Sequence, residues 1–172
     1  MRDWQVYTDA SVNTQSKVGY GAYLVVSEPS ACLDSLKDTV KIRRFEQSTS
    51  SKLELQTLLW ALDEIIPLLG ETDIALTVYT DCQTIITLPD RQSSLEQRNY
   101  LSSKHKRLNN YELYQRFYAI SAKLPFSLIK VAGHQPASKK NQNDRRFALV
   151  DQASRRALRK EFSKVCAGKS RI

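Results

Sequence analysis

The sequence predicts an α/β fold, and two observations carry that prediction. Apolar segments rich in β-branched and aromatic residues come first, and a segment with helical periodicity then separates them from a further strand. With 172 residues, 41% of them hydrophobic, the chain can build one hydrophobic core but has little room for a second. We therefore expect residues 1–172 to form a single domain.

The first quarter of the chain predicts a three-stranded antiparallel meander. The strand-like segments are Trp4–Thr8, Val18–Val26 and Val40–Phe45. No helical segment long enough for a crossover separates them, and antiparallel neighbours are the strands that short connections can join.

A long helix follows, from Lys52 to Leu69. Ser51 is its expected N-cap, and Pro67 and Gly70 are expected to end it. Its apolar residues recur at helical spacing, at Leu55, Leu58, Leu59, Leu62, Ile65 and Ile66.

The next strand, Ile74–Thr80, is continuously apolar, as a strand buried on both faces should be. Because a helix separates it from the meander, it is expected to join the sheet in parallel. The remaining elements are a short helix with an exposed loop over Leu88–Asn110, a helix over Tyr111–Lys123, a strand over Phe126–Val131, and a basic amphipathic helix over Phe147–Phe162.

Charge is distributed unevenly along the chain, whose formal net charge is +8. Residues 1–90 carry 7 Lys/Arg and 13 Asp/Glu, whereas residues 91–172 carry 19 and 5. A basic half on an otherwise acidic chain predicts a surface for a polyanion, most often nucleic acid, because releasing counterions from phosphates drives such binding. The alternative is a solvated basic face.

Several classes of protein are not indicated. Cys32, Cys82 and Cys166 are odd in number and lack paired spacing, so neither a disulfide framework nor a zinc knuckle is expected. No leader pattern opens the sequence, and no apolar run approaches the roughly 20 residues that span a bilayer. We expect a soluble, cytoplasmic monomer with no membrane partner.

Four carboxylates stand at the end or edge of apolar segments: Asp9 in YTDAS, Glu54 in KLELQ, Asp81 in VYTDC and Asp151 in LVDQA. Ligands of open α/β sheets gather at the carboxyl ends of strands, so Asp9 and Asp81 are expected to project from one sheet edge. Converging carboxylates repel one another unless cations balance them. An oxygen-only ligand set favours Mg²⁺ or Mn²⁺ over zinc.

Each of these carboxylates also has a purely structural interpretation. Ser51 and Glu54 have the spacing of a capping box, in which the glutamate bonds the N-cap amide. Asp9 and Asp81 are residues of a type that often forms turns at strand ends.

The order and spacing of the motifs resemble type 1 ribonuclease H over nearly the whole chain. The motifs are TDAS, GYGAYLVV, TSSKLELQTLLWAL, VYTDCQTI, KVAGH and LVDQASRRAL. The resemblance implies a ribonuclease H-like fold, with a five-stranded mixed sheet of three antiparallel and then two parallel strands, flanked by helices. It also implies that Asp9, Glu54, Asp81 and Asp151 hold two Mg²⁺ or Mn²⁺ ions, and that His134 is a mobile base or proton shuttle.

The implied reaction is endonucleolytic hydrolysis of the RNA strand of an RNA–DNA hybrid. It leaves a 5′-phosphate and a 3′-hydroxyl, with one ion activating water and the other stabilising the leaving oxygen. By the same resemblance, Thr49 and Lys52 bind a DNA-strand phosphate and Gln83 contacts the minor groove. Ser50 and Ser51 stand where many members carry asparagines that contact base edges and 2′-hydroxyls.

The sequence departs from the family pattern in two places. The loop from Gln135 to Val150 is longer than usual, so Asp144 has the commoner distance from His134. We choose Asp151, because an aspartate that opens a helix with small residues at following turns is the family pattern. The basic run Lys139, Lys140, Arg145 and Arg146 in this loop is expected either to bind phosphate or to be solvated.

The second departure is the basic segment from Arg91 to Arg116, where some members carry a tryptophan that grips DNA. Tyr100 and Tyr111 are candidates for flat contacts in its place. Trp4 and Trp60 lie in core-patterned segments and are expected to pack.

Two other functions remain open from the sequence alone. One is a related nuclease that cuts structured DNA or double-stranded RNA. The other is a non-catalytic nucleic-acid-binding module with this fold, which the carboxylates disfavour because they would repel a phosphate.

Overall fold

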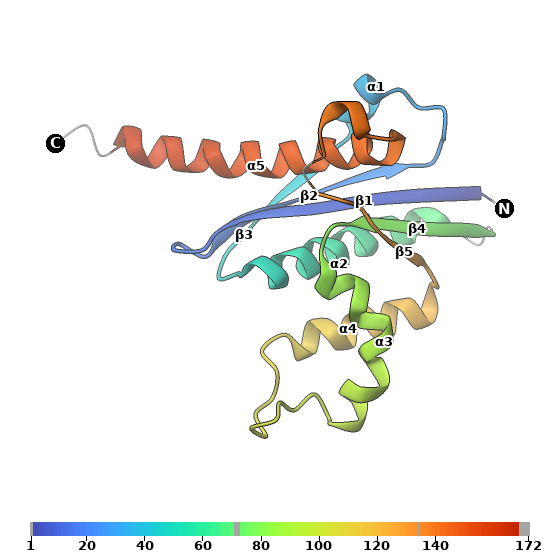
Figure 1. Ribbon diagram of the computed structural model, residues 1–172, viewed down its shortest axis with the longest axis vertical. Helices are drawn as coiled ribbons and strands as arrows, with labels where there is room; N and C mark the ends of the chain where they lie inside the picture. The colour runs from blue at the N-terminus through green and yellow to red at the C-terminus, as the bar shows by residue number, and fades with distance from the viewer. Residues whose placement is uncertain (1, 71–72, 134, 169–172) are drawn as a thin grey trace.

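The computed structural model describes residues 2–70, 73–133 and 135–168, which form a five-stranded mixed sheet with helices on both faces (Figure 1). The strand order is β3-β2-β1-β4-β5, with β1, β2 and β3 antiparallel and β4 and β5 parallel to β1. The predicted sheet is therefore confirmed. The elements are β1 (Arg2–Asn13), β2 (Val18–Val26), α1 (Leu33–Lys37), β3 (Lys41–Phe45), α2 (Ser50–Leu69), β4 (Ile74–Thr80), α3 (Gln83–Gln97), α4 (Tyr111–Lys123), β5 (Ser127–Lys130), a short 3-10 turn (Ala137–Lys139) and α5 (Gln142–Gly168).

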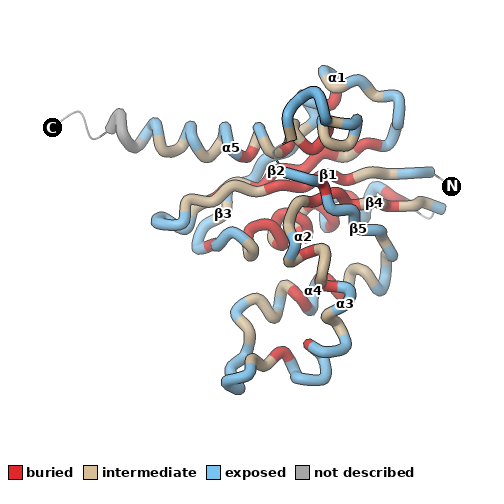
Figure 2. Tube along the Cα trace, in the orientation of Figure 1, coloured by how far each residue is buried: buried red, intermediate tan, exposed pale blue. Residues whose placement is uncertain are grey.

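Each face of the sheet has its own hydrophobic core. Helices α2, α3 and α4 cover one face, and α5 with α1 covers the other (Figure 1). The buried stretches in Figure 2 lie where β1, β2 and β4 meet α2 and the first half of α5. Trp4 and Trp60 pack against the core on the α2 side, as expected.

Two glycines of β2 allow α2 to lie unusually close to the sheet. A Cβ atom on Gly19 would lie 2.3 Å from Leu53 Cδ2, and one on Gly21 would lie 2.1 Å from Thr57 Oγ1. Both spaces are filled by α2 side chains, one helical turn apart. Because Glu54 lies in this same turn, the close approach sets the distance between the Glu54 carboxyl and the strands.

The α5 face contains a buried arginine within a polar network. Arg146 is 1% exposed and donates hydrogen bonds to Gln5 Oε1 and to the carbonyl of Pro29, both at 2.7 Å. The Tyr7 hydroxyl donates to Asn143 Oδ1 at 2.8 Å. We expected Arg146 in a phosphate-binding or solvated loop, and this was wrong. Helix α5 begins five residues earlier than expected, which turns this side chain inward.

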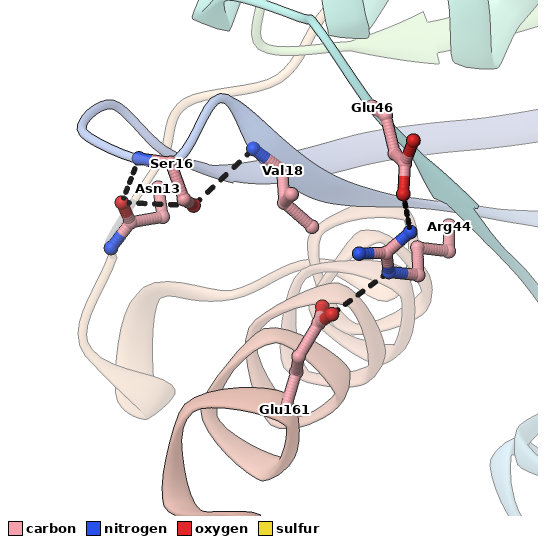
Figure 3. Close-up of polar contacts among 6 residues, drawn as sticks. All are labelled: Asn13, Ser16, Val18, Arg44, Glu46 and Glu161. Carbon is pink, nitrogen blue, oxygen red and sulfur yellow. Dashed lines mark hydrogen bonds and ion pairs between the residues drawn. The ribbon is translucent and has the colours of Figure 1, made fainter. Parts of the chain in front are cut away.

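Polar contacts also secure the β1–β2 turn and the outer strand (Figure 3). Asn13 Oδ1 accepts hydrogen bonds from the backbone and hydroxyl of Ser16, at 2.9 and 3.2 Å. Arg44 on β3 pairs with Glu46, and its Nε donates to Glu161 Oε1 on α5 at 2.8 Å. The second pair ties the edge strand to α5 at one point.

The ends of α2 differ from the prediction. The helix already includes Ser51, and Thr49 precedes it in extended conformation without a side-chain cap bond. The Ser51 N-cap, and the capping box with Glu54 that depends on it, were therefore wrong. Pro67 was expected to help end the helix, and this was wrong, because α2 continues through it to Leu69. Gly70, with φ of 63°, ends the helix as expected.

Other helix boundaries also differ from the predicted ones, because tertiary packing forms helices where the local sequence pattern is too short to indicate them. Helix α1 was not predicted, since five residues are too few to show a periodicity. Helix α3 begins before the polar stretch and runs through Pro89. Tyr100, expected to be exposed, is buried at 6%. Within the described residues, no helix is both long and apolar enough to cross a membrane.

We expect Gly21→Ala to lower the free energy of unfolding by about 1–3 kcal/mol, because the added methyl overlaps Thr57. Urea denaturation measures this change. In the double variant Gly21→Ala/Thr57→Ala, the overlapping hydroxyl and methyl are gone, so the two effects should be strongly non-additive. Simple additivity would contradict the close packing described here.

Candidate active site

Asp9 and Asp81 come together where two parallel strands part. The parallel pairing of β1 with β4 ends at Tyr7 and Tyr79, yet β1 continues to Asn13 alongside β2. We had expected Asp9 at the end of the first strand, but it lies inside β1. It nevertheless sits at the level where β4 has stopped, and Asp81 follows β4 directly.

Glu54 joins these two aspartates from the first turns of α2. One carboxylate oxygen from each of Asp9, Glu54 and Asp81 lies within 4.8 Å of the others. Asp9 is 5% exposed and Glu54 8%, while Asp81 is partly exposed. Among the described residues, Glu54 Oε2 is one of the few buried side-chain oxygens without a hydrogen-bond partner. The sequence prediction that these three carboxylates converge is confirmed.

The local environment opposes negative charge on this cluster. Burial raises the pKa of Asp9 to about 8, helped by the neighbouring charges of Asp81 and Asp151. Burial raises the pKa of Glu54 well above its ordinary value, and Asp9 and Asp81 add to the effect. Hydrogen bonding to the backbone of Ala10 lowers both values but does not outweigh desolvation. The cluster is thus a site that a positive ion would stabilise.

The two candidates for the fourth carboxylate lie in different surroundings. Asp151 lies on α5 close enough to Asp9 to interact through hydrogen bonding and charge. Its Oδ1 is 2.7 Å from Arg155 Nε, one helical turn on. Asp144 instead forms a reciprocal capping box with Asn141, accepting from the Asn141 amide at 3.0 Å and donating its own amide to Asn141 Oδ1 at 2.8 Å. Asp144 therefore has a structural role in starting α5.

A cleft of about 470 Å³ opens beside these carboxylates. Asp81 and Asp151 line it together with Asp144, and Lys140 and Arg155 bring positive charge to its wall. Sequence reasoning missed Arg155, although its position four residues after Asp151 on a predicted helix is the spacing of an ion pair. His134 lies outside the described residues.

A second hollow, of about 620 Å³, lies at the N-terminus of α2. It is lined by Thr49, Ser51 and Lys52, three of the predicted substrate contacts, and Ser50 is exposed beside them. The N-cap residue Thr49 makes no side-chain cap bond, and the first amides of a helix carry a partial positive charge. The hollow is also lined by four residues that no sequence pattern singled out: Lys17, Gln47, Asn109 and Asn110.

Gln83 is not among the described lining residues of this hollow, whereas the basic segment reaches it through Asn109 and Asn110. Gln83 is the first residue of α3, and its Oε1 accepts a hydrogen bond from Lys130 Nζ on β5. In the segment after α3, Tyr111 is partly exposed and Arg107 lies over its ring at 4.8 Å from the centroid. Tyr111 also packs against the core on the α2 side, and Tyr100 is buried.

The donor set of the cluster fits a hard divalent cation. All its atoms are carboxylate oxygens, which Mg²⁺ and Mn²⁺ prefer. The unpartnered oxygen of Glu54 and the mutual repulsion within the cluster are both features that such an ion would relieve. Asp9, Glu54 and Asp81 are the residues positioned to hold it, with Asp151 adjacent.

Comparison with known proteins agrees with the fold. Residues 1–157 match the family model of RNase H. No curated protein sequence matches the chain.

Several solved structures share the fold at low sequence identity. The PFV RNase H domain is 14% identical, with a TM-score of 0.65 over 90% of this chain and 92% of that one. LC11-RNase H1, solved in complex with an RNA/DNA hybrid, is 18% identical, with a TM-score of 0.58 over 90% and 99%. The prototype foamy virus protease-reverse transcriptase is 15% identical with a TM-score of 0.66, and the match covers 90% of this chain but only 20% of that much longer protein. With the family match spanning 157 consecutive residues, this chain belongs to the RNase H family.

Proposed function

We propose that this protein is a metal-dependent endoribonuclease that hydrolyses the RNA strand of RNA–DNA hybrids to 5′-phosphate and 3′-hydroxyl ends. The observation that carries the proposal is the cluster of buried Asp9 and Glu54 with partly exposed Asp81, in which one carboxylate oxygen of each residue lies within 4.8 Å of the others. A protein that only bound nucleic acid would gain nothing from three carboxylates at the place where a phosphate must lie. Membership of the RNase H family supports the same assignment.

In this proposal, Asp9, Glu54 and Asp81 hold divalent cations, and Asp151 completes the ligand set from α5. When bound, two Mg²⁺ or Mn²⁺ ions supply charge that activates a water molecule and stabilises the leaving 3′-oxygen. The rigid placement of these side chains on β1, α2 and the end of β4 pre-orients them, so little reorganisation is needed when a phosphate arrives. Arg155 holds the Asp151 carboxylate from one side. His134 is assigned proton transfer by resemblance to the family.

The substrate's DNA strand is proposed to lie over the hollow at the N-terminus of α2. Thr49 and Lys52 line that hollow, and Lys17 adds a second positive charge across it. An uncapped helix N-terminus with nearby lysines is suited to a phosphate group. Ser50, Ser51 and Gln83 are proposed to contact the minor groove of the hybrid.

The first test uses labelled RNA–DNA hybrid, double-stranded RNA and duplex DNA, each incubated with Mg²⁺ or Mn²⁺. We expect cleavage of the RNA in the hybrid only, with 5′-phosphate ends on the products. Cleavage of structured DNA or double-stranded RNA instead would favour the related-nuclease alternative. Binding without cleavage of any substrate would leave the non-catalytic module.

Substitution of single carboxylates tests the ligand set. Asp81→Asn and Asp151→Asn should each lower kcat at least roughly a hundredfold, which corresponds to about 2.7 kcal/mol of transition-state stabilisation. Asp144→Asn is the matched control. It removes a carboxylate that lines the same cleft but whose proposed role is to cap α5. Its effect should appear in the unfolding free energy and leave kcat within a fewfold of wild type. Equal effects of Asp144→Asn and Asp151→Asn would overturn the choice of Asp151.

The cluster also predicts an unusual pH dependence of stability in EDTA. In the unfolded chain the Asp9 carboxyl has its ordinary pKa of 3.8, whereas burial raises its folded-state pKa to about 8. The folded protein therefore binds more protons between these values, so its free energy of unfolding should fall as pH rises from about 4 towards 8. Thermal denaturation at a series of pH values measures this slope.

Removing the charge should remove the penalty. Near pH 7.5 in EDTA, Asp9→Asn should be more stable than wild type, on the order of 2 kcal/mol, and saturating Mg²⁺ should stabilise wild type but not this variant. Asp90→Asn, which removes an exposed carboxylate on α3, controls for net charge. A flat metal-free profile for wild type would contradict the electrostatics of the cluster.

The phosphate assignment makes a separate kinetic prediction. Lys52→Ala and Lys17→Ala should each raise KM for the hybrid by roughly 3- to 10-fold with little change in kcat. Each should also reduce the slope of log binding constant against log salt concentration by about one, the value for one lost phosphate contact. Lys123→Ala at the end of α4 is the control, because it removes an exposed lysine away from this hollow. Unchanged KM and salt slope in both variants would remove the hollow from the substrate path.

A further inference from the structure

A groove separate from the catalytic cleft lies between α5 and the outermost strand of the meander. Its volume is about 340 Å³. Helix α5 packs mainly over β1 and β2, so it leaves the same face of β3 largely uncovered. Ile42 is 47% exposed at this place, and few other large hydrophobic side chains of the described residues are exposed. Its floor consists of the aliphatic side chains of Val40 and Ile42 from the β3 side and of Leu149, Ala153 and Ala157 from α5, and Gln152 of α5 also lines the groove.

The alternation of side chains along β3 explains why Ile42 faces this groove. Arg44 reaches Glu161 on α5, whereas Arg43 lies 6.0 Å from the ring centroid of Trp60 on α2. Neighbouring residues of a strand point to opposite faces, so Ile42 points to the α5 side with Arg44. The apolar side chain is thus directed into the groove by the register of β3 against β2.

The groove adjoins a free sheet edge. Strand β3 lies at one edge of the sheet, and within the described residues it pairs only with β2. Half of its backbone N–H and C=O groups therefore point outward, where another extended chain can pair with them. The strand is short and carries Lys41 and Arg43, which discourages pairing with a second copy of this basic chain.

The rim of the groove is positively charged. Lys37 from the end of α1 and Arg156 and Lys160 from α5 line it, and no acidic residue is among its described lining residues. Glu161, on the same turn of α5, is already paired with Arg44. An occupant with negative charge is favoured at this place.

We propose that this groove binds an extended, acidic peptide segment of a partner protein, which adds to β3 as a sixth strand. Alternate apolar side chains of the segment occupy the aliphatic floor, and its carboxylates face Lys37, Arg156 and Lys160. Peptide addition to a sheet edge combines main-chain hydrogen bonds with pockets for every second side chain, and both features are present here. A nucleic acid fits less well, because the floor has no aromatic ring for a base to stack on and the strand edge matches a peptide backbone.

The test uses a fluorescein-labelled synthetic peptide of alternating aspartate and isoleucine, with fluorescence anisotropy as the readout. The full-length protein should bind it saturably, and Ile42→Ser or Arg156→Glu should weaken binding by roughly tenfold or more. Ile129→Ser is the matched control, because Ile129 is 43% exposed on β5, the opposite edge strand. Hybrid hydrolysis should be unchanged in Ile42→Ser, since the groove lies apart from the carboxylate cluster.

Three outcomes would overturn the proposal. One is no saturable peptide binding up to about 1 mM. Another is equal binding by Ile42→Ser and wild type. The third is that a single-stranded oligodeoxynucleotide of matched charge binds more tightly than the peptide and that Arg156→Glu weakens its binding to the same extent. That result would assign the surface to nucleic acid. Strand addition is checked by amide hydrogen exchange, which should slow in residues 41–45 when the peptide binds; unchanged exchange there would refute a sixth strand.

Discussion

Mutual repulsion among buried carboxylates is the constraint around which this fold is arranged. Asp9, Glu54 and Asp81 come from a strand interior, a helix and a strand end, and burial together with the neighbouring Asp81 and Asp151 raises the pKa of Asp9 to about 8. Holding such groups together costs folding free energy, which the two hydrophobic cores on either side of the sheet must offset. The site is therefore a place where the fold gives up stability to prepare chemistry, as functional sites commonly do.

Both layers of helices contribute to that arrangement by different physical means. On one face, the bare backbone of Gly19 and Gly21 lets α2 approach until Leu53 and Thr57 fill the space. On the other, the network of Arg146, Gln5 and Tyr7 fixes the first turns of α5 against β1. Close apolar contact thus sets the depth of Glu54, and directional hydrogen bonds set the position of the helix that carries Asp151.

Sequence reasoning succeeded where a signal was local and strong. Periodicity predicted the antiparallel meander, α2 and α4. The apolar segments before Asp9 and Asp81 predicted that these two carboxylates lie close together, although Asp9 lies inside β1 and not at its end. Sequence reasoning failed where tertiary contacts decide the outcome. Arg146 belongs to a basic run in the sequence and was therefore expected at the surface, and only the packing of α5 shows that it is buried. The hydrogen bonds between Asp144 and Asn141 also needed coordinates, because spacing along the chain does not reveal them. Lys17 and Asn110 reach the α2 hollow from distant segments, and no pattern links them.

The contact between Gly21 and Thr57 has a consequence for how this chain can diverge. A side chain at position 21 and a branched side chain at position 57 compete for one volume, so the two positions are not free to change independently. In descendants of this sequence, a larger residue in the strand is tolerated only after the helix residue has become smaller. The order of such substitutions is thereby restricted, and an evolutionary record of this pair should show them changing together.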